Sequence, residues 1–167
     1  MTIESSMFEI VIADLSKPNH AIALVELLNI YALDPMGGGQ ELSDFVKENL
    51  AATLAARSDV HVILAIEHEN PIGMLICIEG FSTFACQPLL NIHDAIVKPE
   101  DRGRGVSRMM FDRAEQIARE IGCCKLTLEV LAGNKIAKSA YTNFGFVGFQ
   151  LDPHLGEALF LQKKLST

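Results

Sequence analysis

Residues 95–107 of this chain read AIVKPEDRGRGVS, and an amphipathic segment follows them to about residue 121. The apolar run predicts a strand, and Gly103 and Gly105 predict a tight turn that opens a helix. The first N–H groups of a helix have no intrahelical acceptor, and the helix dipole adds partial positive charge there. A strand–turn–helix unit of this kind is suited to hold a pyrophosphate, so we expect a nucleotide-type phosphate site.

Three known phosphate-binding patterns compete for this turn. The dinucleotide fingerprint G-x-G-x-x-G requires a small residue where Arg108 stands. A Walker loop requires Gly-Lys-Ser/Thr after four spacer residues, and neither this turn nor the glycine run at 37–39 has that sequence. The third pattern, R/Q-x-x-G-x-G/A, matches Arg102 and Gly105 but has Ser107 at its last position. Such a short match is weak by itself, so its interpretation depends on the rest of the chain.

Composition restricts the class of protein. A chain of 167 residues that is 49% hydrophobic predicts one domain, 1–167, with one core. A formal net charge of −7 argues against a nucleic-acid partner, because no basic surplus exists to neutralise phosphates. No apolar run approaches the ~18 residues of a membrane span, and residues 1–14 lack a secretion-signal pattern. We therefore expect a cytoplasmic protein without a membrane partner.

The four cysteines give no sign of a metal site or of a disulfide. Cys123 and Cys124 are adjacent and do not match a C-x-x-C spacing, and Cys77 lies in an apolar run. We interpret Cys77, Cys86, Cys123 and Cys124 as reduced and structural, and we expect no metal.

Hydrophobic periodicity predicts a mixed α/β fold. Helices are expected at 19–33 with Asn19 as the cap, at 43–56 with Ser43 as the cap, at 107–121 and at 134–143. Strands are expected at 8–14, 60–67, 72–78, 92–97, 125–131, 146–151 and 159–164. The phosphate turn therefore lies in the middle of the chain, between a strand and the third helix.

Over nearly its whole length the sequence resembles the GNAT superfamily of acetyltransferases. The strand before the turn ends in Val97-Lys98-Pro99, and a typical block follows the turn. That block is Asn134, Ala137, Ala140, Tyr141, Gly145 and Phe146. The resemblance implies the GNAT fold: a central, mixed, mostly antiparallel twisted sheet of six to seven strands, flanked by about four helices and splayed between the fourth and fifth strands.

The resemblance also implies a binding site for acetyl-CoA as the co-substrate. The pantetheine arm would lie in the splay and pair with the main chain of Ile96 and Val97. The Asn134 side chain would hydrogen-bond the CoA arm. The pyrophosphate would be held by the amides of the turn, namely Arg102, Gly103, Arg104, Gly105, Val106 and Ser107. Serine at 107 keeps its N–H, so we expect weaker close packing there rather than the loss of the site.

Tyr141 resembles the general acid of the family, the phenol that protonates the departing CoA thiolate. A thiol with a pKa near ~8.5 leaves more readily beside a donor, and a phenol with a pKa near ~10 stays protonated at pH 7. The alternative is a tyrosine that only packs. No cysteine stands at a recognised nucleophile position, so direct transfer in a ternary complex is expected rather than an acyl-enzyme.

The acceptor side is left open by the sequence. An amine with a pKa near ~10.4 is protonated at pH 7, and deprotonating it costs about 4.6 kcal/mol at ~1.36 kcal/mol per pH unit. His93 and Glu129 are the main candidates for the base. Asp94 is a lesser candidate, expected on the opposite strand face from His93, and a water relay is equally possible. Glu129, in Leu-Glu-Val, resembles the carboxylate of acetyltransferases that act on protein amino termini.

The expected acceptor is a small primary amine. In the family that the sequence resembles, the first two helices form a wall of the acceptor pocket, and a glycine-rich loop joins these helices here. Residues 34–41 join the first two helices, and Asp34 and Glu41 would favour a cationic acceptor. The segment 80–84 is faintly similar to the polyamine and diamine branch of the family. A non-catalytic CoA or acyl-CoA sensor is the alternative outside enzymes, and a homodimer is possible because dimers are common in such proteins.

Overall fold

The computed structural model describes residues 8–156 and 158–165. The chain divides into two compact units, Met1–Leu128 and Glu129–Thr167, and each is described by itself. A single domain over the whole chain stays a prediction.

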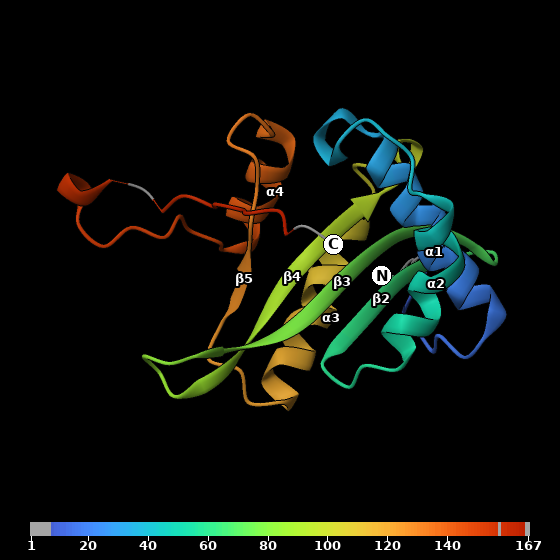
Figure 1. The fold of residues 1–167 in the computed structure, drawn as a ribbon, viewed down its shortest axis with the longest axis horizontal. Coiled ribbons are helices and arrows are strands. Elements are labelled where there is room, and N and C mark those ends of the chain that lie inside the picture. Colours follow the sequence, from blue (N-terminus) through green and yellow to red (C-terminus); the bar gives the residue numbers. More distant parts are fainter. Residues whose placement is uncertain (1–7, 157, 166–167) are drawn as a thin grey trace, which may run out of the picture. The chain divides into compact units, whose positions relative to one another are not determined.

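The first unit is built on a five-stranded sheet in the order β1-β2-β3-β4-β5 (Figure 1). Its strands are β1 (Glu9–Ile12), β2 (Val60–Glu67), β3 (Asn70–Ser82), β4 (Gln87–Val97) and β5 (Leu126–Leu128). The first four pair antiparallel, and β5 runs parallel to β4. The predicted mixed, mostly antiparallel sheet is therefore confirmed.

Three helices complete the first unit: α1 (Pro18–Leu33), α2 (Asp44–Ala55) and α3 (Val106–Glu120). The Ser43 hydroxyl accepts a hydrogen bond from Val46 N at 3.3 Å, so the predicted cap of α2 is confirmed. The predicted cap of α1 is wrong: Lys17 is the N-cap, without a side-chain bond, and Pro18 begins the helix. Proline suits that position because its missing N–H would have no intrahelical acceptor there.

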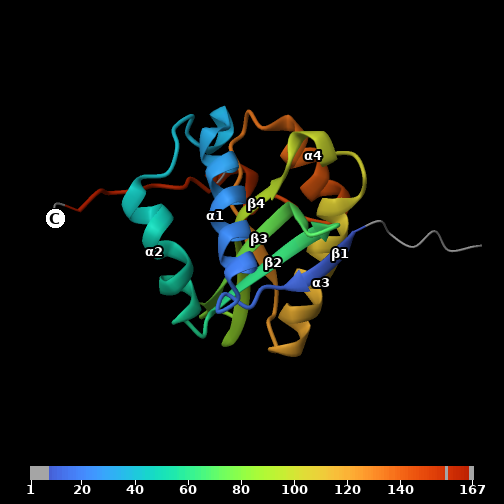
Figure 2. The same cartoon turned by 90° about the vertical axis from the view of Figure 1, so that its right-hand side faces the viewer.

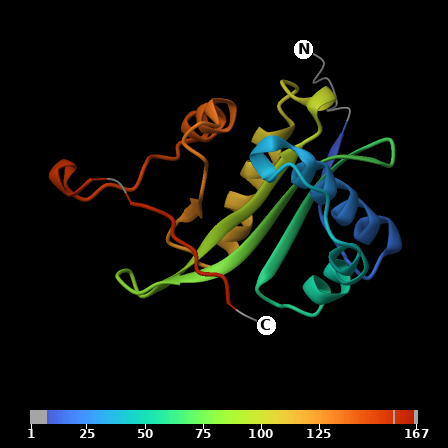
Figure 3. The same cartoon turned by 45° about the horizontal axis from the view of Figure 1, so that its top comes forward.

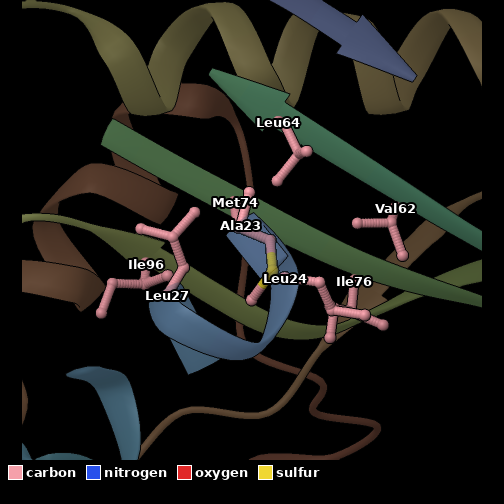
Figure 4. Packing of buried hydrophobic residues seen from close by; sticks show 8 residues of the cluster. All are labelled: Ala23, Leu24, Leu27, Val62, Leu64, Met74, Ile76 and Ile96. Atoms are coloured by element: carbon pink, nitrogen blue, oxygen red, sulfur yellow. The ribbon is translucent and has the colours of Figure 1, made fainter. Parts of the chain in front are cut away.

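Helices cover both faces of the sheet. Figures 2 and 3 show α1 and α2 along one face and α3 along the other. Between α1 and the sheet lies a buried apolar cluster (Figure 4), formed by Ala23, Leu24, Leu27, Val62, Leu64, Met74, Ile76 and Ile96. The intervening strand residues Ile63, Ala65 and Leu75 are fully buried on the α3 side. Because the sheet is packed on both faces, it holds the end of β4 and the start of the following loop in a fixed position.

A β-bulge at His93 changes which residues of β4 face α1. Ile92 pairs with Cys77, but Asp94 pairs with the adjacent Ile76, so His93 is an extra residue in β4. Because directly paired residues share a face, Asp94 lies on the α1 face with Ile76. Simple alternation along β4 is interrupted at this point, and the prediction that His93 lies on the opposite face from Asp94 stays a prediction.

The predicted count of six to seven strands is wrong, because the described residues form five. The strand expected at 125–131 is limited to Leu126–Leu128, and 146–151 and 159–164 form no strand in the part of the chain that is described. Alternating apolar residues indicate side-chain periodicity, whereas a strand also requires a hydrogen-bonded neighbour. The pairing of β5 covers only Leu90–Ile92 of β4. Beyond it, residues 93–97 of β4 run on to the phosphate turn.

The second unit contains α4 (Lys135–Phe144) and a short 3₁₀ turn, Pro153–Leu155. Asn134 caps α4, and Gly145 ends it in a left-handed conformation with φ 114°. The Tyr141 ring lies edge-on to Phe146, with 6.1 Å between ring centroids. No helix in the described ranges is both long and apolar enough to cross a membrane.

Candidate functional site

The predicted phosphate turn has the conformation that its glycines suggested. After β4, one 3₁₀ turn (Pro99–Asp101) leads to Gly103 with φ 76° and Gly105 with φ 83°. A Cβ built on either glycine meets nothing within 4 Å, so one side of the loop is open. The first helical bond of α3 runs from Met109 N to Gly105 O at 3.2 Å. The amides just before it therefore have no intrahelical acceptor and can bind an anion.

The start of α3 packs unusually close to the sheet. A Cβ on Gly73 of β3 would lie 3.0 Å from Met110 Cε, 3.1 Å from Val106 Cγ1 and 3.1 Å from Ile96 O. Only glycine permits this approach without a shift of its neighbours. Sequence reasoning missed Gly73, although an isolated glycine within an apolar strand is a recognised sign of close backbone approach.

Arg102 and Arg104 direct their side chains to protein groups. Arg102 Nε donates to the Val97 carbonyl at 3.2 Å, and its guanidinium lies 3.7 Å from Asp34. Arg104 forms ion pairs with Glu67 at the end of β2 and with Asp101. Both arginines therefore fasten the loop to the sheet or to the α1–α2 connection, and only their main-chain amides were predicted to act.

The predicted base candidates of the first unit lie at the bulge in β4. His93 is exposed, and its neighbour Asp94 is half-buried. Burial raises the pKa of Asp94, although the nearby His93 opposes that shift. Burial also raises the pKa of Tyr31, and the negative charges of Asp94 and Asp34 act in the same direction. Sequence analysis did not single out Tyr31, because only the fold brings the end of α1 next to the bulge in β4.

Replacing Asp94 by asparagine should stabilise the protein more at pH 8 than at pH 4. Folding raises the pKa of the Asp94 carboxyl. Its contribution to the free energy of unfolding is therefore fully present at a pH below the pKa of the unfolded chain, and it is lost as the pH rises through the pKa of the folded protein. Asparagine has no such loss, so the gain in free energy of unfolding should appear at the higher pH. Urea unfolding at both pH values measures it. The control is Asp112→Asn, which replaces an exposed aspartate that pairs with Arg108 on α3. An equal change in the free energy of unfolding for both variants would contradict the prediction.

The glycine-rich connection between α1 and α2 is ordered around Asp34. Its side chain accepts from Met36 N at 2.8 Å, and its carbonyl accepts from Gly37 N at 2.8 Å and Gly39 N at 3.1 Å. A Cβ on Gly37 would lie 1.9 Å from the Tyr31 carbonyl, so that glycine is required by packing. At Gly37 the loop backbone therefore approaches the end of α1 too closely for any side chain.

The remaining predicted residues belong to the second unit. The side-chain Oδ1 of Asn134 accepts from Ala137 N at 3.1 Å and so caps α4. The side-chain amide has two further donors, so capping is compatible with a bond to a ligand. Tyr141 is half-buried on α4, and Glu129 precedes that helix. Their roles stay predictions.

A sequence model of the acetyltransferase (GNAT) family matches residues 24–146. The chain belongs to the GNAT acetyltransferase family. It is therefore an acyltransferase by family, and the predicted GNAT fold is confirmed apart from its strand count.

Relatives and solved structures agree with the GNAT assignment. A thialysine N-epsilon-acetyltransferase of Caenorhabditis elegans is 28% identical over 138 residues, 78% of this chain and 79% of that protein. A streptothricin acetyltransferase of Streptomyces lavendulae is 41% identical over 83 residues, 50% of this chain and 44% of that one. An aminoglycoside acetyltransferase from an uncultured soil sample, in complex with sisomicin, has a similar fold. Its TM-score is 0.77 at 16% identity, over 96% of this chain and 97% of that one.

Of the four cysteines, only Cys77 is buried. All four are free thiols, and burial raises the pKa of Cys77 to about 12. Such a thiol is almost never ionised at neutral pH, so it is no nucleophile. Within the described ranges, no group of three or more His, Cys, Asp or Glu side chains is placed to hold a metal ion.

Proposed function

We propose that this GNAT protein transfers acetyl from acetyl-CoA to a small cationic amine by direct attack in a ternary complex. The observation that carries the donor half is the loop 102–107. It has two left-handed glycines, one open side and a helix that begins directly behind it. GNAT proteins use acetyl-CoA. The free main-chain amides at the start of a helix are suited to bind its pyrophosphate.

In this proposal the amides of 102–107 bind the pyrophosphate and the main chain of Ile96 and Val97 pairs with the pantetheine arm. The end of β4 supports this, because its pairing with β5 stops at Ile92. The Val97 amide would polarise the thioester carbonyl as an oxyanion donor. Asn134 would hold the CoA arm through its side-chain amide. Tyr141 would protonate the thiolate that leaves.

The acceptor half rests on charge and on the relatives. Burial raises the pKa of the Tyr31 phenol, and the charges of Asp94 and Asp34 add to that shift, so two acidic side chains give a negative local field here. Such a field favours a protonated amine on approach. Two curated relatives are named as acetyltransferases of thialysine and streptothricin. A small cationic amine is therefore the acceptor that fits best.

Deprotonation of the acceptor requires a base. We propose His93, directly or through water, because it is exposed at the bulge and lies beside the half-buried Asp94. Glu129 is the second candidate, and a role for it would instead favour a peptide amino terminus as the acceptor. The variants His93→Gln and Glu129→Gln separate the two candidates. Replacing the residue that acts as the base should lower kcat by about 10²–10⁴-fold and shift the acidic limb of the pH profile of kcat.

The decisive experiment measures release of free CoA thiol from acetyl-CoA. Polyamines, lysine analogues and aminoglycosides form one panel, and peptides with free amino termini form the other. Turnover with the small amines supports the proposal, and turnover with peptides alone would favour the amino-terminal alternative. Tight CoA binding without thiol release for any acceptor would indicate a sensor. A homodimer and a cytoplasmic location are also expected, and sedimentation velocity tests the first.

A further inference from the structure

The side chain of Arg104 links the phosphate loop to a distant strand. Its Nη1 donates to Glu67 Oε2 at 3.2 Å and its Nη2 to Glu67 Oε1, across 37 residues of sequence. Nη1 also bonds Asp101, which is 8% exposed. The guanidinium lies 5.9 Å from the ring centroid of Phe8. A fork that meets one carboxylate with two nitrogens is directional as well as charged, and it fixes the position of the loop.

The place of Arg104 in the loop makes this link consequential. Arg104 stands between Gly103 and Gly105, both of which have positive φ. Neither glycine has a side chain that could hold the loop, and glycine backbone is the most freely mobile. The fork to Glu67 and Asp101 is therefore the side-chain anchor of this three-residue segment. Its amides are the ones that would face the pyrophosphate.

Charge argues against Arg104 as a phosphate ligand. One guanidinium faces two carboxylates, so the cluster carries a formal charge of −1 and does not by itself attract the phosphates of CoA. The hydrogen bonds with Arg104 hold the pKa of Glu67 below its ordinary value, so Glu67 is ionised at neutral pH. A polyanion would have to displace both carboxylates before it could use the guanidinium.

We propose that Glu67, Arg104 and Asp101 form a latch that orients the loop amides for CoA, with Arg104 as a positioning residue. The proposal rests on the donor site proposed above. It extends that site to Glu67, a residue at the end of β2 that the phosphate-binding pattern does not include.

The variant Glu67→Gln distinguishes the latch from direct phosphate binding by the sign of its effect. Without a latch, removal of a negative charge near the loop should leave CoA binding unchanged or make it tighter, because Arg104 is released. With a latch, the bidentate fork is lost and the loop amides lose their fixed positions. We then expect the dissociation constant of CoA and the KM for acetyl-CoA to rise about tenfold. The kcat at saturating acetyl-CoA should stay within about twofold, because the reacting groups are intact.

Calorimetric titration of CoA makes the test, with Glu115→Gln as the matched control. Glu115 pairs with Arg119 on the exposed side of α3, so its replacement makes the same change in net charge. It should not weaken binding. Arg104→Gln should weaken binding as much as Glu67→Gln, and the double variant should be no weaker than Arg104→Gln alone, because partners in one interaction are non-additive. Unchanged or tighter binding by Glu67→Gln, or additive losses in the double variant, would overturn the latch.

Two further measurements keep the outcome clear. If Glu67→Gln does not fold, Glu67→Asp retains the charge but withdraws the carboxylate by one methylene, and it should weaken CoA binding in the same way. Normal binding by that variant would also overturn the latch. If the unaltered protein does not bind CoA, the donor-site proposal itself fails. If the unaltered protein and Glu67→Gln bind CoA equally well, the latch is contradicted and the donor site is not.

Discussion

Replacing Tyr141 by phenylalanine is expected to lower kcat by about 10²–10⁴-fold, the range of general acid catalysis. The variant keeps the ring and therefore the edge-on contact with Phe146 at 6.1 Å, so α4 should remain folded. In the proposed mechanism, the variant loses the hydroxyl that protonates the CoA thiolate. The dissociation constant of CoA should stay within about twofold, because protonation of the leaving group contributes after binding.

The leaving group itself provides the sharper check on Tyr141. Thiols that are more acidic than CoA leave without protonation by an acid. The loss of kcat in Tyr141→Phe should therefore be smaller when an acetyl thioester of an aromatic thiol replaces acetyl-CoA. Thr142→Val, which removes an exposed hydroxyl from the same helix, is the control and should be close to the unaltered enzyme. Equal kcat for Tyr141→Phe and the unaltered protein would leave Tyr141 as a packing residue.

The variant Gly105→Ala is expected to weaken CoA binding by about 10- to 100-fold. Gly105 has φ 83° at the N-cap of α3, a conformation that strains an alanine by roughly 1–2 kcal/mol. Its Cβ would project into the open side of the loop, where nothing lies within 4 Å. Loss of one charge-assisted hydrogen bond to the pyrophosphate, about 1.5–3 kcal/mol, accounts for this range.

A glycine beyond the other end of α3 separates backbone strain from loss of the site. Gly122, just after the other end of the helix, has φ 76° and likewise has open space around a built Cβ. Gly122→Ala should therefore lower the free energy of unfolding about as much as Gly105→Ala does, yet leave CoA binding unchanged. Isothermal titration and urea unfolding of both variants measure the two effects. Equal weakening of CoA binding by both would mean that general destabilisation, and not the loop, is responsible.

The sequence alone predicted the elements whose causes are local. The glycines of the turn have the positive φ values that their lack of a side chain allows, and Ser43 caps α2 as its hydroxyl suggested. The family, the fold class and the helices followed from such local signals. The cap of α1 was predicted two residues too late, at Asn19 instead of Lys17, because the fixed φ of Pro18 suits the first helical position.

Errors arose where a feature depends on pairing between distant segments. The segments 146–151 and 159–164 alternate like strands, but alternation describes side chains, and a strand also depends on a neighbour for its backbone. The bulge at His93 is a mismatch between two strands, so β4 by itself does not reveal it. Residues chosen as base candidates were therefore known by type and position, but the faces they occupy were not.

By itself, the sequence determined that this protein is a GNAT acetyltransferase, and it predicted a phosphate loop at 102–107, because a turn and a helix start are encoded within a few residues. Only the tertiary structure decided what holds that loop and what surrounds the acceptor side. Arg104 meets Glu67 across 37 residues, and Tyr31 of α1 comes within the field of Asp94 on β4. Such contacts depend on which strands pair and which face each helix covers, and the long-range packing of the sheet sets both.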